Sequence, residues 1–283
     1  MCFKAANIAV LSTIMQIFGH SFMVRAVVVG LLVSLCAALL GVSLVLKRYS
    51  MIGDGLSHVG FGALAIAAVL NAAPLAVAAP IVVLAAFLIL RISENSKIRG
   101  DAAVAMISTG SLAVGVFIMS LSPGMNADIH SFMFGSILAM SRRDVLISAV
   151  LAAVIFTLFA LFYNKIFAVT FDEAFARAIG VRAKLYNMLL AFLTAITIVL
   201  GMRMMGALLI SSLIIFPALT SMRLCKRFKA VTICSACVSA ACFLAGIVAS
   251  YKLETPTGAT IVTVNIITFA LFAVVAAIRT ADF

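Results

Sequence analysis

The sequence predicts an all-α membrane protein, a polytopic bundle of about eight to nine transmembrane helices. Apolar residues make up 65% of its 283 positions and charged residues only 10%, whereas a soluble domain is about 45–50% apolar. The apolar residues form long unbroken runs, which differ from the alternating strands of a membrane barrel. Because each crossing needs about 20 apolar residues, the chain has room for little besides such helices.

Charged and turn residues divide these runs into nine candidate spans. In chain order they cover residues 23–46, 54–72, 74–90, 102–121, 143–163, 184–202, 204–222, 230–250 and 258–278. Two joins are tight, one at Asn71-Ala72-Ala73-Pro74 and one near Arg203. Either join can hide a broken or re-entrant helix, which would lower the count to eight.

The first residues form a separate region. Residues 1–22 are predicted to make a short or interfacial helix, ahead of a membrane domain that covers residues 23–283. Residues 3–18 are apolar and follow Lys4, as in a signal peptide, but no small-residue cleavage pattern follows at Gly19-His20-Ser21. We therefore expect this segment to remain on the protein.

The net charge of +11 does not indicate nucleic-acid binding, because Lys and Arg stand singly or in pairs between apolar runs. With nine spans, 14 of the 20 basic residues fall on one side of the membrane and six on the other. The richer side is cytoplasmic by the positive-inside rule. We therefore expect a multi-pass protein of the bacterial cytoplasmic (inner) membrane, with its N-terminus outside and its C-terminus inside.

One loop on the basic side encodes a short amphipathic helix over residues 171–179. Thr170 is a candidate N-cap, with Glu173 three residues later completing a capping box, and Gly180 supplies a left-handed stop. Asp172 and Glu173 suit the positive end of the helix dipole. Phe171 and Phe175 are expected to share a face. The helix either lies on the lipid surface or docks a cytoplasmic partner.

An acidic residue and a histidine open the second span. Asp54 and His58 are four residues apart, so one helical turn brings them to the same face. A carboxylate inside the bilayer costs about 2.5–3.5 kcal/mol, so such a pair indicates a functional site. Carboxylate and imidazole ligands suit zinc, manganese or ferrous iron. The alternative is an interfacial helix cap beside a packing histidine. Glycines around the pair (Gly53, Gly55, Gly60 and Gly62) would let another helix approach closely.

Other candidates are weaker. Cys234 and Cys237 form a Cys-x-x-Cys pattern, but they lie in an apolar span without a second pair and are interpreted as packing residues. His130 lies in an outward loop, where it either meets an arriving ion or is simply solvated. Pro217 lies within a span near two serines, a composition that suits a pore-lining or a merely packed helix. Those serines are Ser211 and Ser212.

No phosphate loop of the Gly-x-x-x-x-Gly-Lys-Ser/Thr type occurs in the sequence, so we expect no ATP hydrolysis by this chain. There is also no His-Glu-x-x-His motif and no nucleophile elbow. An enzyme is therefore not predicted, and any energy from ATP must come from a separate subunit.

Five motifs follow one another along the chain. They are Gly53-Asp54-Gly55-Leu56-Ser57-His58, Phe134-Gly135-Ser136-Ile137-Leu138, Phe171-Asp172-Glu173 with Ala178-Ile179-Gly180-Val181, Gly206-Ala207-Leu208-Leu209 leading to Pro217-Ala218, and Pro256-Thr257-Gly258-Ala259-Thr260. In order and spacing they resemble the permease subunits of the zinc, manganese and iron ABC importers. The resemblance extends from about residue 20 to nearly the end of the chain.

This resemblance implies a homodimeric permease with two cytoplasmic ATPase subunits and an extracytoplasmic metal-binding protein. It implies that Asp54 and His58 line the path of the transported metal, and that the 171–179 helix couples the permease to the ATPase. No permanently bound cofactor is expected. Two rivals remain, an ion-coupled secondary metal carrier and an ABC permease for a siderophore or vitamin.

Overall fold

The computed structural model describes residues 21–95, 100–121 and 140–281, and this part of the chain is helical with no strand. The helices are α2 (Ser21–Leu46), α3 (Met51–Val69), α4 (Pro74–Asn95), α5 (Gly100–Ser120), α7 (Arg142–Leu161), α8 (Tyr163–Phe171), α9 (Glu173–Ala178), α10 (Ala183–Met205), α11 (Ala207–Leu224), α12 (Phe228–Leu253) and α13 (Thr257–Ala281). Within the described residues, nine of them are long and apolar enough to cross a membrane. The predicted fold class is confirmed.

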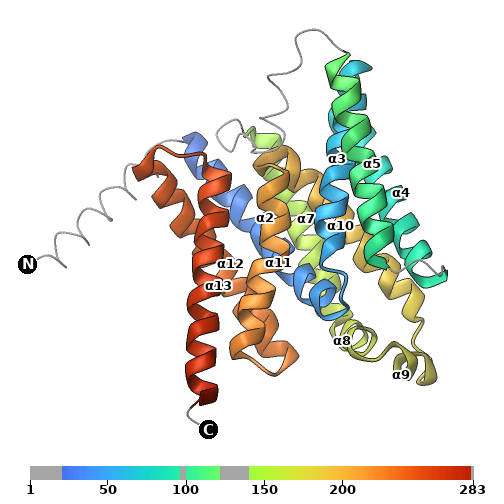
Figure 1. Cartoon of the computed structure of the whole chain (residues 1–283), viewed down its shortest axis with the longest axis vertical. Helices are drawn as coiled ribbons and strands as arrows, with labels where there is room; N and C mark the ends of the chain where they lie inside the picture. Colours follow the sequence, from blue (N-terminus) through green and yellow to red (C-terminus); the bar gives the residue numbers. More distant parts are fainter. Residues whose placement is uncertain (1–20, 96–99, 122–139, 282–283) are drawn as a thin grey trace, which may run out of the picture.

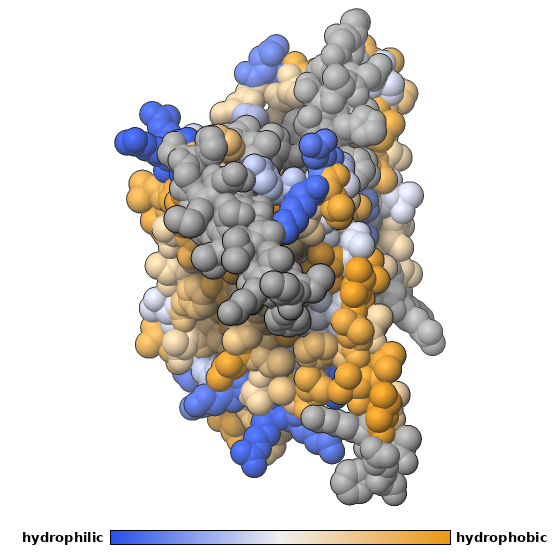
Figure 2. Space-filling view, turned by 90° about the vertical axis from the view of Figure 1, so that its left-hand side faces the viewer, coloured by the Kyte–Doolittle hydropathy of each residue, from blue (hydrophilic) through white to orange (hydrophobic). Residues whose placement is uncertain are grey.

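The long helices form a bundle (Figure 1), and many large apolar side chains are exposed on its surface. The span of α2 is 78% buried, and α3 and α10 are each 72% buried. In contrast, only 11% of the α13 span is buried. Among the residues coloured in Figure 2, apolar ones predominate in the middle, and most hydrophilic ones lie toward the two ends. This distribution suits a protein surrounded by lipid.

Glycines bring α3 against α5, as the sequence predicted. A Cβ atom added at Gly62 would lie 2.7 Å from the carbonyl oxygen of Ser111 on α5. One added at Gly55 would lie 2.6 Å from the Val104 side chain. These helices therefore pack backbone against backbone, which positions the rest of α3 tightly.

Both tight joins separate complete helices. α3 ends at Val69, three residues before the predicted end, and Asn71 in the connection has a φ of 49°. α10 and α11 are separated at Gly206, whose φ of 92° is accessible to a glycine. The count of nine is therefore correct for the described residues.

The N-terminal helix predicted for residues 1–22 lies almost wholly outside the described residues. Ser21 and Phe22 already belong to α2. Short α8 and α9 lie at the end of the bundle that also carries the C-terminus (Figure 1). We call this end the α9 end.

Candidate metal site

Asp54 and His58 form a pair within α3. Oδ2 of Asp54 lies 3.5 Å from Nε2 of His58. The N-cap of α3 is Ser50, so Asp54 is inside the helix and is not its cap. The Asp54 side chain is 47% exposed and that of His58 is 28% exposed, so the pair is accessible to a small ligand.

The pair faces a cavity of about 270 Å³ formed by three helices. The other lining residues come from α3, α5 and α11: Ser57, Phe61, Leu112, Ala207, Leu208 and Ser211. The walls are thus mostly apolar, with Asp54 the one carboxylate and His58 the one imidazole of the lining.

The separation of the two donor atoms fits a single transition-metal ion. Ligand distances of about 2.1 Å combined with a 3.5 Å separation give a ligand–metal–ligand angle of about 110°, close to tetrahedral. Among the described residues, no group of three or more His, Cys, Asp or Glu side chains is placed to hold a metal. With Asp54 and His58 as its two protein ligands, a bound ion would keep other coordination positions open.

A serine from each of two helices meets beside the pair. The hydroxyl oxygens of Ser57 on α3 and Ser211 on α11 are 3.0 Å apart. Of the three predicted pathway residues, only Ser211 lines the cavity; Ser212 and Pro217 are buried elsewhere in α11. Ser57 was not among the predicted site residues, although its place between Asp54 and His58 in the sequence was a signal for it.

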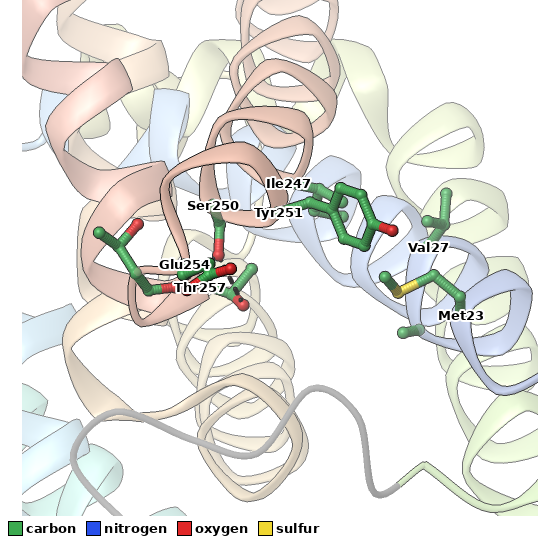
Figure 3. Close-up of a pocket in the computed structure, with 9 residues that line it drawn as sticks. Met23, Val27, Ile247, Ser250, Tyr251, Glu254 and Thr257 are labelled. Atoms are coloured by element: carbon green, nitrogen blue, oxygen red, sulfur yellow. Dashed lines mark hydrogen bonds between the residues drawn. The ribbon is translucent and has the colours of Figure 1, made fainter. Parts of the chain in front are cut away.

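A second and larger cavity, of about 470 Å³, lies between the start of α2 and the α12–α13 connection (Figure 3). Its one carboxylate is Glu254, in a left-handed conformation with a φ of 52°. The Ser250 hydroxyl donates to the Thr255 carbonyl oxygen at 2.7 Å, and its oxygen lies 3.1 Å from the Thr257 hydroxyl, which can donate to it. Without an imidazole or second acid in its lining, this cavity fits a transition metal less well than the Asp54 cavity.

Two weaker candidates gain no support as ligands. Cys234 and Cys237 are free thiols on α12 and belong to no metal-binding group within the described residues. His130 lies outside the described residues.

The predicted loop helix exists, but its start differs from the prediction. α8 continues through Phe171, so Thr170 is a buried residue inside α8, and its hydroxyl has no partner. The cap is Asp172, whose carboxylate accepts a hydrogen bond from the Phe175 backbone N–H at 2.9 Å. The predicted Thr170 capping box is therefore wrong. Thr170 and Phe171 belong to α8 because Ile166 and Val169 of this helix pack into the core, which extends α8 past the predicted cap.

The end of α9 follows the prediction. Gly180 has a φ of 82°. Its N–H donates to the Arg177 carbonyl, and the Val181 N–H donates to the Ala176 carbonyl at 2.9 Å. This pair of bonds is a Schellman motif, which ends the helix after one and a half turns.

The side chains of this segment point in two directions. Phe171 and Phe175 are 57% and 58% exposed, but they belong to α8 and α9 respectively, so they do not share the face of one helix as predicted. Glu173 points back to the bundle, where it contacts Lys47 and Asn187.

The Glu173 carboxyl is held in its charged form. Partial burial raises its pKa, but hydrogen bonds from Arg177 and Asn187 and the charges of Lys47 and Arg177 outweigh burial. The pKa therefore lies below its ordinary value of 4.5.

The sequence model of the ABC 3 transport family matches residues 19–277. The chain belongs to this family. The match covers every described transmembrane helix almost completely, and it confirms the resemblance found from the motifs.

Two family relatives and a solved structure extend this result. The chain is 30% identical over 260 residues to a "Probable iron transport system membrane protein" of Haemophilus influenzae, covering 92% of each protein. It is 27% identical over 256 residues to the "Manganese transport system membrane protein MntC" of Halalkalibacterium halodurans, covering 90% of this chain and 88% of the relative. The structure "PsaBC from Streptococcus pneumoniae in complex with Fab" aligns with a TM-score of 0.82 at 26% identity, over 93% of this chain and 94% of the matched chain.

Proposed function

We propose that this chain is the membrane-spanning subunit of an ATP-driven importer for a divalent transition metal, with the ion passing Asp54 and His58. The observation that carries this proposal is the 3.5 Å pair facing a cavity inside the helix bundle. An ionisable pair is costly among apolar helices unless it serves a ligand.

Manganese and iron are the first candidate ions, because named relatives transport manganese and iron. Zinc also accepts a carboxylate and an imidazole. The carboxylate and imidazole that face the cavity support a transition-metal ion over a siderophore or vitamin.

The α9 end faces the cytoplasm in this proposal. Most basic residues of the described loops and helix ends lie there by chain connectivity, including Lys165, Arg177, Arg182, Lys226 and Arg227. The positive-inside rule favours this orientation in a bacterial cytoplasmic membrane.

α9 is the contact for a separate ATPase. Phe175 on α9 and Ile179 at its C-cap are 58% and 56% exposed, and α9 lies outside the membrane-spanning set, as suits docking into a partner's groove. The chain itself has no phosphate loop. A second copy of the permease and an extracytoplasmic metal-binding protein complete the assembly.

The transport cycle is alternating access. ATP binding moves the ATPase subunits, α9 follows them, and the bundle exposes the Asp54–His58 cavity first to one side of the membrane and then to the other. The chain performs no covalent step.

The test is manganese uptake into proteoliposomes that contain the permease and its ATPase, with ATP inside and the metal-binding protein outside. Asp54→Asn and His58→Ala should each reduce ATP-dependent uptake at least about tenfold, equivalent to about 1.4 kcal/mol. Glu254→Gln is the matched control, because it removes a carboxylate from the other cavity.

Two outcomes would reject the proposal. Normal uptake by both site variants, with intact assembly, would remove Asp54 and His58 from the pathway. Uptake driven by an ion gradient without ATP would identify a secondary carrier instead.

A further inference from the structure

Three side chains from separate parts of the chain form a closed polar triangle next to α9. The Lys47 ammonium lies 3.6 Å from Oε2 of Glu173, and the same oxygen accepts a hydrogen bond from Nδ2 of Asn187 at 3.1 Å. Lys47 also donates to Oδ1 of Asn187. Each member thus contacts the other two, and together they connect α9, α10 and the corner between α2 and α3.

The triangle is largely shielded from solvent. The Lys47 side chain is 8% exposed, Asn187 is 5% exposed, and the Glu173 side chain is 31% exposed. Separating a buried ammonium from its carboxylate is strongly destabilising. A movement of Glu173 with α9 is therefore coupled energetically to Lys47.

The corner that holds Lys47 is short and stiff. Lys47 directly follows α2, and α3 begins four residues later at Met51. The Tyr49 N–H donates to the Leu44 carbonyl at 2.8 Å, and the Ile52 N–H donates to the Tyr49 carbonyl at 3.0 Å. A displacement of Lys47 therefore reaches the first turn of α3, which carries Asp54.

We propose that Lys47 is a positioning residue that transmits the movement of α9 to α3 and so to the Asp54–His58 cavity. This inference rests on the proposed function. It separates two roles within α9: Phe175 faces outward toward the ATPase, whereas Glu173 links the helix to the bundle.

The test compares manganese transported per ATP hydrolysed in proteoliposomes that contain the whole complex. Lys47→Gln and Glu173→Gln should each lower this ratio at least about fivefold, the lower end of usual coupling between sites. Hydrolysis and co-purification with the ATPase should persist. The charge-swapped double variant, Lys47→Glu with Glu173→Lys, should recover part of the ratio, which a change of general stability would not produce.

Arg177→Gln is the matched control, because Arg177 also pairs with Glu173 but its side chain is 64% exposed and outside the triangle. Its ratio should stay near that of the wild type. If Lys47→Gln does not assemble, Asn187→Ala keeps the ion pair and should lower the ratio less.

The inference is overturned if both single variants keep the wild-type ratio. It is also overturned if uptake and hydrolysis fall together in both single variants and in Asn187→Ala, without recovery in the swap. A wild-type complex that moves none of manganese, iron and zinc would instead reject the proposed function. If Asp54→Asn lost uptake while Lys47→Gln and Glu173→Gln kept a normal ratio, the role of Lys47 would be rejected and the proposed function would stand.

Discussion

The hydroxyl oxygens of Ser57 and Ser211 lie 3.0 Å apart and join α3 to α11 beside the Asp54–His58 pair. Each hydroxyl oxygen also lies near the carbonyl oxygen four residues earlier in its own helix, Ser57 at 2.9 Å from Gly53 and Ser211 at 3.1 Å from Ala207. Because each hydroxyl has one proton, the two serines donate two hydrogen bonds among these three contacts. The two oxygens are therefore fixed in place next to the cavity.

Ser211→Ala should weaken metal transport. It removes a fixed oxygen of the cavity, so the KM for manganese should rise roughly two- to tenfold, as expected for one lost polar contact of about 0.5–1.5 kcal/mol. The control is Ser212→Ala, because the Ser212 hydroxyl is buried without a partner and lies outside the cavity lining. Equal KM values for the two variants would contradict a role for Ser211.

Gly62→Ala should destabilise the bundle. The added methyl would lie 2.7 Å from the Ser111 carbonyl oxygen, and overpacking of this kind costs about 1–3 kcal/mol. We expect a lower midpoint in thermal unfolding of the purified permease. Gly110→Ala on α5 is the control, because no atom lies within 4 Å of its added methyl. The prediction fails if both variants unfold at the same temperature.

Phe175→Ala should release the ATPase and leave the permease folded. The Phe175 side chain is 58% exposed in the isolated chain, so its loss costs little stability. Truncating an aromatic anchor at an interface costs about 2 kcal/mol or more, or roughly 30-fold in affinity. Co-purification measures this loss, with Phe117→Ala, 64% exposed on α5, as control. Undiminished recovery of the ATPase with Phe175→Ala would be the contrary result.

Acid should weaken the attachment of α9. The pKa of Glu173 is lowered in the folded protein, so its contribution to stability is fully present above 4.5, its ordinary value, and is lost as pH falls through the lower folded value. The charged groups facing it are Lys47 and Arg177. The difference in unfolding temperature between wild type and Glu173→Gln should be constant near neutral pH and shrink below about 4.5. If this difference in unfolding temperature grew as the pH fell, the pKa of Glu173 would be raised in the folded protein, and the prediction would be wrong.

The sequence was sufficient for features that depend on local pattern. Runs of about 20 apolar residues define the spans, four-residue spacing places Asp54 with His58, and Gly180 ends α9. It was not sufficient where two local solutions compete. Thr170 and Asp172 are both good capping residues, and the choice of Asp172 depends on how far α8 packs into the core.

Contacts between distant segments were beyond the sequence pattern. Ser211 and Ser212 are adjacent, and only the packing of α11 on α3 decides which one meets the cavity. Helices α3 to α8 lie between Lys47 and Glu173 in the sequence. Nothing in the local sequence around either residue indicates their ion pair. The spacing of residues in a helix indicates which side chains share a face, but it does not indicate which other helix that face contacts.

The break at Gly206 places the first turn of α11, with Ala207 and Leu208, against the Asp54 cavity. The backbone N–H groups of a first helical turn lack intrahelical partners and carry partial positive charge. The cavity faced by Asp54 and His58 is thus also lined by a helix start, so its electrostatic field combines one carboxylate with the partial positive charge of a helix N-terminus.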